Sequence, residues 1–297
     1  MSNITAKPLK PQDLDVNNLS FASVRTMPNG AKIVYVNHKS GMLYLQSPEL
    51  SITMDTGNYF PDQTDNSGKF SIRTSLENYN VDGPVKTFHD TLKSLDEHLI
   101  KKAVECSGEW FENLKWFKKK GLSVEEKVTD NYTPIMKLSL DSETGEPDGK
   151  WPPSFSFKVV RRENKFLCDC FDSDKKEINT QCTPEEFDEQ FKETFVGMFK
   201  KGTTVKTIVK CNGVWISNVG WGCTWKVEQI RINTPKGFSG YSFEDTDDED
   251  SDEGVPLTRT DTVAKPEPDN LVESDEDSGE EEEEDEEEAV VKRKVKK

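Results

Sequence analysis

The chain has 297 residues and carries 56 Asp and Glu against 39 Lys and Arg, which gives a net charge of −17. The imbalance lies in one segment, because residues 244–288 hold 24 acidic and 2 basic residues, while residues 289–297 add 5 basic ones. No apolar run approaches the roughly 18 residues of a membrane span, and residues 1–10 lack the apolar core of a secretion signal. Six Cys are too few for a disulfide scaffold in a body of this size, and none of them forms a Cys-x-x-Cys pair. We therefore expect an intracellular protein with a neutral body, an acidic tail and no membrane contact.

The first part of the chain predicts a flexible arm followed by strands. Residues 1–20 are polar and contain Pro8 and Pro11, which is typical of a loose segment. Apolar and polar residues then alternate, and turn residues separate the alternating runs. We expect a hairpin of strands 31–36 and 42–46 around a turn at 37–41, followed by strands at 50–55 and 69–76.

The middle of the chain predicts helices. Apolar residues at steps of three and four predict a helix over residues 88–105, with a buried stripe of Phe88, Leu92, Leu95, Leu99 and Ala103. A second helix is expected over residues 109–120, ending at Gly121, and a short helical stretch over residues 123–128.

The rest of the body predicts strands interrupted by one helix. A strand is expected at residues 136–141, and residues 154–162 and 165–171 form a predicted hairpin around 163–164. Thr183 and Glu186 make a capping box for a helix over residues 183–200, which carries Phe187, Phe191, Phe195 and Phe199 on one face. Strands are expected at 203–211, 214–219 and 221–232, and order is expected to fade beyond Pro235.

The sequence gives no support for catalysis. It contains no glycine-rich phosphate loop, no nucleophile motif and no His placed near a Cys or Ser in a known arrangement. We therefore predict no enzymatic activity, no catalytic residue, no cofactor and no metal. A zinc site that uses Cys168, Cys170 and Cys182 is the alternative, against reduced and buried thiols.

Aromatic residues interleaved with basic ones indicate nucleic-acid binding. On an ideal helix over 109–120, Trp110 and Phe117 face the core, and Trp116 projects to the opposite side. We expect Trp116 to stack on a base, with Lys118, Lys119 and Lys120 beside it for phosphate. The alternative is that Trp116 packs against another element.

The terminal strands and the 154–171 hairpin supply further candidates. Lys206 and Lys210 share one strand face, and Trp221 and Trp225 share one face of the last strand, opposite Lys226. Trp221 and Trp225 are candidates either for base stacking or for a barrel core. The remaining candidates for nucleic-acid contact are Trp215 and the hairpin-tip residues Arg161, Arg162 and Lys165, for which a solvated surface is the alternative.

The acidic tail fits the same function. A neutral body followed by a polyanionic tail is typical of proteins that bind single-stranded DNA, since the tail competes for the basic groove and recruits partners when DNA displaces it. A solubilising or histone-binding role is the alternative. Residues 290–297 resemble a nuclear-import signal or a latch onto the acidic run.

The strand-rich body, the closing segment WGCTWKVEQIRI within residues 214–232, and the strands at 31–54 resemble the single-stranded DNA-binding proteins of nucleocytoplasmic large DNA viruses, such as asfarviruses and phycodnaviruses. The resemblance implies a mainly β fold with α insertions (α+β), namely an OB-like β-barrel with inserted helices. It also implies work in viral DNA replication, recombination or repair.

We divide the chain into a flexible arm (1–20), an OB-like nucleic-acid-binding body (21–236) and a disordered acidic tail with a basic tip (237–297). The predicted partners are single-stranded DNA, with RNA as an alternative, and viral replication proteins that bind the tail. The predicted location is the viral factory in the host cytoplasm, the nucleus or the virion. The alternative functions are a virion-associated or structural interaction protein and an acidic chaperone for basic proteins.

Overall fold

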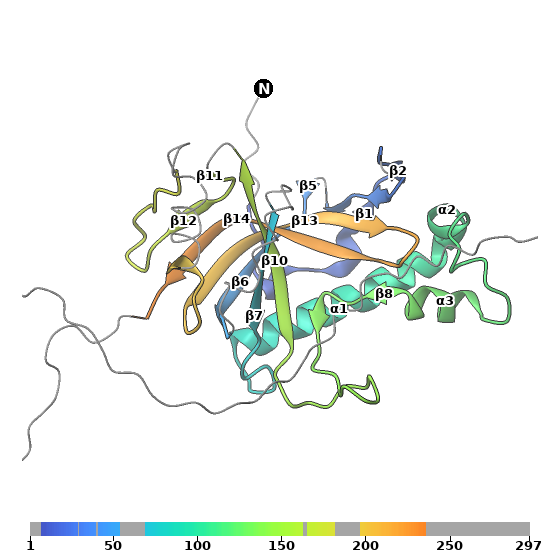
Figure 1. Ribbon diagram of the computed structural model, residues 1–297. Helices are drawn as coiled ribbons and strands as arrows, with labels where there is room; N and C mark the ends of the chain where they lie inside the picture. Colours follow the sequence, from blue (N-terminus) through green and yellow to red (C-terminus); the bar gives the residue numbers. More distant parts are fainter. Residues whose placement is uncertain are drawn as a thin grey trace, which may run out of the picture. The chain divides into compact units, whose positions relative to one another are not determined.

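The computed structural model describes residues 7–28, 30–39, 41–53, 69–162, 165–181 and 197–235, all of which belong to one compact unit, Met1–Ser239 (Figure 1). The helices are η1 (Pro11–Asp13), η2 (Val16–Asn18), α1 (Pro84–Glu105), α2 (Ser107–Phe111) and α3 (Val124–Asp130). The strands are β1 (Leu19–Phe21), β2 (Arg25–Thr26), β3 (Lys32–Val34), β4 (Val36–His38), β5 (Gly41–Met42), β6 (Tyr44–Ser51), β7 (Lys69–Ser75), β8 (Tyr132–Thr133), β9 (Met136–Lys137), β10 (Ser154–Arg162), β11 (Lys165–Phe166), β12 (Asp169–Phe171), β13 (Thr204–Ile216) and β14 (Trp221–Asn233). The described part is therefore mostly β with a few helices, as expected.

Five long strands pair in a closed circuit. Strand β6 pairs with β7, β7 with β10, β10 with β14, β14 with β13, and β13 with β6 again. The β10–β14 pairing is parallel and the other four are antiparallel. Outside the circuit, β12 extends the sheet beside β14, β3 and β2 extend it beyond β13, and β1, β4 and β5 form a small separate sheet.

Strands β13 and β14 form the longest ribbon. The sequence predicted two strands, 203–211 and 214–219, in place of β13, because Gly213 between them was assigned to a turn. Gly213 instead sits at a β-bulge with a φ of 107°, where a Cβ atom would lie 2.6 Å from the Val34 carbonyl oxygen. A glycine is required there both by the positive φ and by the close approach of β3, so the strand continues through it.

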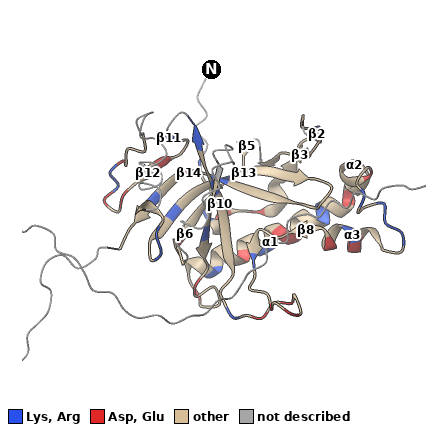
Figure 2. Cartoon of the chain, viewed as in Figure 1, with Lys and Arg blue, Asp and Glu red and all other residues tan. Residues whose placement is uncertain are grey.

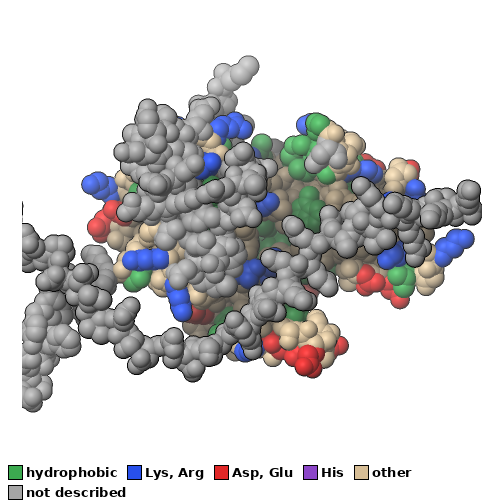
Figure 3. Space-filling model, viewed as in Figure 1, with side chains coloured by type: hydrophobic (Ala, Val, Ile, Leu, Met, Phe, Trp, Pro, Cys, Tyr) green, Lys and Arg blue, Asp and Glu red, His purple; other side chains and the backbone are tan. Residues whose placement is uncertain are grey.

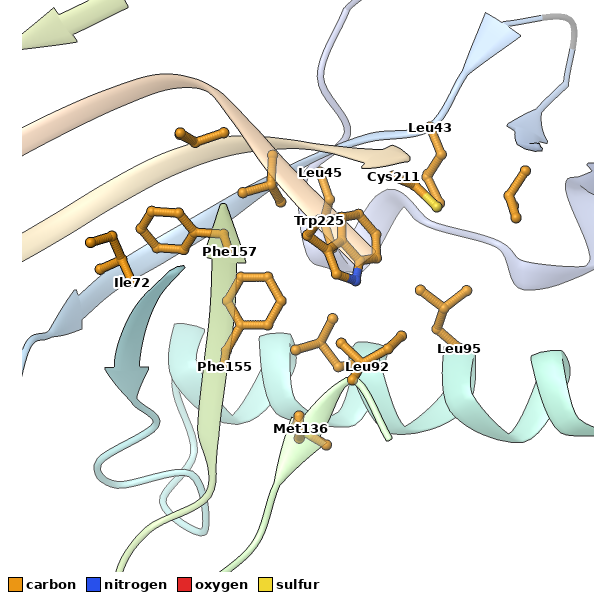
Figure 4. Packing of buried hydrophobic residues seen from close by; sticks show 14 of the residues in the cluster. Leu43, Leu45, Ile72, Leu92, Leu95, Met136, Phe155, Phe157, Cys211 and Trp225 are labelled. Carbon is orange, nitrogen blue, oxygen red and sulfur yellow. The ribbon is translucent and has the colours of Figure 1, made fainter. Parts of the chain in front are cut away.

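The core lies between the strand circuit and helix α1. The stripe that the sequence predicted on this helix is buried as expected: Phe88, Leu92, Leu95, Leu99 and Ala103. Figure 4 shows Trp225 of β14 pointing toward this helix, between Leu92 and Leu95 on one side and Leu45 on the other. Helix α1 therefore packs its apolar stripe against the core formed by the strands.

Several strand predictions need correction. The expected 31–46 hairpin exists only as the short β4–β5 pairing, because β3 leaves it to pair with β13 and β6 does the same. Residues 50–51 belong to β6 rather than to a separate strand, and the expected 136–141 strand is reduced to β9. The 154–171 hairpin is confirmed only between β10 and β11, since β12 pairs with β14.

The described part of the expected flexible arm is attached to the body of the protein. The Leu9 N–H donates to the Tyr44 carbonyl at 3.0 Å, and the Gln46 N–H donates to the Leu9 carbonyl at 2.8 Å. Leu9, Leu14 and Val16 pack on the core, which explains why this polar stretch is held. The predicted helix over 183–200 and the acidic tail lie outside the described residues, apart from helical residues 197–198 and the buried Phe199.

The expected helix over 109–120 is wrong beyond Phe111. Helix α2 ends there, and residues 112–120 continue in turns. A straight helix would bury Trp110 and leave Trp116 in water. Leu114, which a straight helix would also bury, stays in the core, and unwinding after Phe111 lets Trp116 join it, so tertiary burial overrides local helix propensity. The short stretch near 123 is confirmed as α3, with a capping box between Ser123 and Glu126.

Candidate nucleic-acid interface

The outer face of the β13–β14 ribbon carries four partly exposed basic residues, Lys206, Lys210, Lys226 and Arg231. In β13, Val205, Thr207 and Val209 are buried, while Lys206 and Lys210 are partly exposed. Residues alternate between the two faces of a strand, so both lysines point away from the core. This placement is as the sequence predicted. Figure 2 shows basic positions along β13 and β14 at the end away from α2.

Strand register places three lysines and an aromatic ring in one row. Lys210 lies opposite Tyr44 of β6 on one side and opposite Lys226 of β14 on the other. Lys226 in turn lies opposite Lys158 of β10. The Lys210 ammonium stands 6.0 Å from the centre of the Tyr44 ring, within the range of a cation–π contact. The row thus places one flat ring at the end of three positive charges.

A second row passes through a hollow of about 260 Å³ beside it. Lys206 lies opposite Arg231, which lies opposite Phe171 of β12, so that two cations and a ring meet across three strands. The hollow is lined by Gln46, Phe171, Lys206, Thr207, Ile208, Gln229, Ile230 and Arg231. The partly exposed Phe171 ring offers a surface for stacking, and the carboxamide groups of Gln46 and Gln229 offer hydrogen bonds. Both lie next to an apolar floor and to the positive charges of the row.

The carboxylates of this face are engaged in other bonds. Glu49 accepts a hydrogen bond from the Thr204 hydroxyl at 2.7 Å, and Asp169 accepts one from the Gln229 amide at 3.0 Å. Glu228 pairs with Lys226 at 3.3 Å.

The cations of the face are less compensated. Among the described residues, no carboxylate lies within ion-pair distance of Lys158, Lys206, Lys210 or Arg231. Burial raises the pKa of Tyr44, with the Glu228 charge acting in the same direction, so the phenol stays neutral at physiological pH. The face therefore offers four cations without an ion-pair contact to the described residues beside a neutral ring, which suits a polyanion with flat bases.

Three of the predicted tryptophans are buried. Trp116 is 5% exposed and its indole N–H donates to the Ser217 carbonyl at 3.0 Å, so the prediction of an exposed stacking ring there is wrong. Trp221 is buried against Tyr132 and donates to the Val128 carbonyl at 2.8 Å. Trp225 is 2% exposed in the core, so Trp221 and Trp225 are core residues rather than stacking residues. Trp215 is partly exposed and lies across from Gly222, which leaves room for its indole.

The remaining predicted basic residues lie apart from the two rows. Lys118, Lys119 and Lys120 are exposed on the loop after α2, which Trp116 fastens to the β13–β14 turn. Lys206 lies ten residues back along β13 from that turn, roughly 33 Å at about 3.3 Å per residue. Arg162 lies opposite Lys165 at the β10–β11 end, and Arg161 stands 5.8 Å from the centre of the Phe70 ring.

Four residues of the interface were missed: Tyr44, Lys158, Phe171 and Arg231. Each alternates with buried neighbours in a predicted strand, so their outward orientation was readable. What the sequence could not supply was the register that gathers them, because β6, β10 and β14 are far apart in the chain and β12 pairs with β14 rather than with the nearby β10.

The cysteines pack as thiols. The sulfur atoms of Cys168 and Cys170 are 3.9 Å apart, and those of Cys211 and Cys223 are 3.3 Å apart. The hydrogen bond to the neighbouring thiol, together with burial, raises the pKa of Cys168 and of Cys223. No group of three metal-ligating side chains occurs within the described ranges, and Cys182 lies outside them. None of the described helices is long and apolar enough to cross a membrane.

No protein-family model and no curated protein matches this chain. Among solved structures, the chain is similar to gp2.5, a single-stranded DNA-binding protein encoded by bacteriophage T7, with 15% identity, coverage of 73% of this chain and 100% of that chain, and a TM-score of 0.37. It is also similar to the single-stranded DNA-binding protein from bacteriophage Enc34, with 12% identity, coverage of 77% and 98%, and a TM-score of 0.35. The same phage protein in complex with single-stranded DNA gives 12% identity, coverage of 74% and 98%, and a TM-score of 0.35. Similarity at this level defines no family, and the resemblance to the large DNA viruses stays a prediction.

Proposed function

We propose that this chain is a sequence-independent single-stranded DNA-binding protein, and that the outer face of β6, β13, β14 and β12 holds the strand. The observation that carries the proposal is the pair of rows on that face. One row joins Tyr44 to Lys210 and Lys226, and the other joins Phe171 to Arg231 and Lys206. Rings accept unstacked bases, and cations accept phosphates.

We further propose that the five-strand circuit is an OB-like barrel. In chain order the strands β6, β7, β10, β13 and β14 pair as first–second–third–fifth–fourth and back to the first, with a parallel third–fifth pairing. A five-stranded Greek-key barrel of this kind is a common platform for oligonucleotides. The closed circuit of strand pairings and the packing of α1 on its core support this proposal.

The direct test is a titration of a fluorescent poly-dT oligomer with the full chain. Because duplex bases are already stacked, we expect single strands to bind more tightly than a duplex of equal length, with little variation among mixed sequences. Exclusive binding to basic proteins would favour the alternatives, a structural interaction protein or an acidic chaperone. A preference for duplex would refute the stacking role of the face.

We also propose that the acidic segment 244–288 competes with DNA for this face and is released to partner proteins when DNA binds. The proposal rests on the charge split, since the residues before it carry equal numbers of acidic and basic side chains. A chain that lacks residues 244–297 should then bind oligo-dT more tightly than the full chain at low salt, and the difference should fade near 0.5 M, where the screening length is about 4 Å. Equal affinities at low salt would contradict the competition. We propose that the protein acts in viral DNA replication, recombination or repair, in a viral factory or in the nucleus.

A further inference from the structure

Residues 138–151, here called the acidic hairpin, form an ordered projection between β9 and β10. The Asp141 N–H donates to the Glu146 carbonyl at 2.8 Å, and the Asp148 N–H donates to the Ser139 carbonyl at 3.1 Å. Gly145 adopts a φ of 71° in the turn and donates to the Asp141 carbonyl at 2.8 Å. These bonds give the segment a defined shape even though it covers none of the core.

Three large apolar side chains of the acidic hairpin are exposed to solvent. Leu138 is 50% exposed, Leu140 is 57% exposed and Trp151 is 67% exposed. Single exposed leucines are ordinary, but three large apolar side chains on one ordered hairpin mark a surface for another macromolecule. Tryptophan in particular contributes much of the binding energy at protein interfaces.

The turn of the acidic hairpin is negatively charged. It carries Asp141, Glu143, Glu146 and Asp148, and Figure 3 shows acidic side chains gathered where Figure 1 places this hairpin, below β10. Hydrogen bonds from the Thr144 and Glu143 N–H groups lower the pKa of Asp141, and the Ser139 hydroxyl lowers that of Asp148, so both are ionised at neutral pH. Its partner should therefore join apolar contact with positive charge.

The same chain carries such a surface around the loop after α2, here called the lysine surface. Lys118, Lys119 and Lys120 are exposed there, and no carboxylate of the described residues lies within ion-pair distance of them. Leu122 and Val124 are each 42% exposed beside them in the chain. Val219, 88% exposed, lies on the β13–β14 turn to which the Trp116–Ser217 hydrogen bond fastens this loop.

We propose that the acidic hairpin of one copy of this protein docks on the lysine surface of a second copy. The two surfaces are complementary in charge, and each adds exposed apolar side chains to the contact. Because they are different patches, the contact is head-to-tail, and each copy keeps one hairpin and one lysine surface for further neighbours. A different basic protein would bind the acidic hairpin, but the lysine surface would then have no partner. The inference does not depend on DNA binding.

Sedimentation velocity of the full chain over a concentration series at about 0.1 M salt tests the proposal, since the screening length there is about 10 Å. The hairpin variant is Glu143→Lys/Glu146→Lys, and the surface variant is Lys118→Glu/Lys119→Glu. All four residues are exposed, so both variants should fold. The control is Lys93→Glu/Lys101→Glu, on the exposed side of α1.

The native chain should associate, and each variant alone should raise the concentration of half-association by at least about tenfold, because like charges then face each other. A 1:1 mixture of the two variants should restore association, since the reversed charges are again complementary. Trp151→Ser should weaken association by a similar factor without a change of charge.

Three results would overturn the proposal. The native chain could stay monomeric throughout, the mixture could fail to associate, or the surface variant alone could lose association while the hairpin variant keeps it. The last result would assign the lysine surface to a different acidic segment. Failure of oligo-dT binding, by contrast, would leave this inference standing.

Discussion

The indole N–H of Trp116 donates a hydrogen bond of 3.0 Å to the carbonyl of Ser217, 101 residues further along the chain. The bond fastens the loop after α2 to the β13–β14 turn. Trp116 also packs on Phe111, with ring centres 5.0 Å apart. The residue that the sequence offered as a stacking platform is thus the anchor that positions Lys118, Lys119 and Lys120.

Trp116→Ala should therefore destabilise the fold by about 3–5 kcal/mol, the usual cost of removing a buried aromatic side chain. Urea unfolding of the variant and the native chain measures the difference. An unchanged unfolding midpoint together with a loss of DNA affinity would contradict the buried position and restore the stacking role.

Trp221 and Trp225 offer a matched pair, since both are buried but only one has a hydrogen-bond partner. The Trp221 N–H donates to the Val128 carbonyl, whereas the buried Trp225 N–H has no acceptor among the described residues. Trp221→Phe should therefore cost about 1–3 kcal/mol more than Trp225→Phe, because it leaves a buried carbonyl without its donor. Equal losses in chemical unfolding would argue against that bond.

Asp96 should make stability depend on pH. The Tyr132 hydroxyl and the Ile135 N–H both donate to its carboxylate, but burial outweighs them and raises the pKa of Asp96 to about 6. The folded state then binds the Asp96 proton more tightly than the unfolded state, so the contribution of this group to stability is fully present below about pH 4 and is lost as pH rises through 6.

Asp96→Asn keeps the acceptor oxygen and removes the buried charge. The variant should lose less stability between pH 4 and 7 than the native chain, by on the order of 3 kcal/mol. Urea midpoints measured across this range test the prediction, and parallel curves for the two proteins would contradict it.

The sequence predicted well what depends on local pattern. The buried stripe of α1 and the outward placement of Lys206 and Lys210 follow from periodicity alone. The sequence-based predictions failed where contacts between elements far apart in the chain determine the structure. Trp116 is buried because the β13–β14 turn provides an acceptor, and Gly213 continues a strand because β3 lies against it. The interface residue Phe171 was missed for the same reason, since its position beside Arg231 depends on a parallel pairing between β12 and β14.

The salt dependence of oligo-dT binding tests the proposed interface most directly. Each phosphate contact on a single strand contributes about −0.7 to the slope of log affinity against log salt. Lys206→Ala/Lys210→Ala should flatten the slope by about 1.4, while the α1 control Lys93→Ala/Lys101→Ala should leave it unchanged. Tyr44→Leu and Phe171→Leu should lower affinity by roughly 1–3 kcal/mol without altering the slope, because they remove stacking rather than charge. A native slope in the Lys206/Lys210 variant, or flattening by the control pair instead, would contradict the assignment of the DNA site to this face.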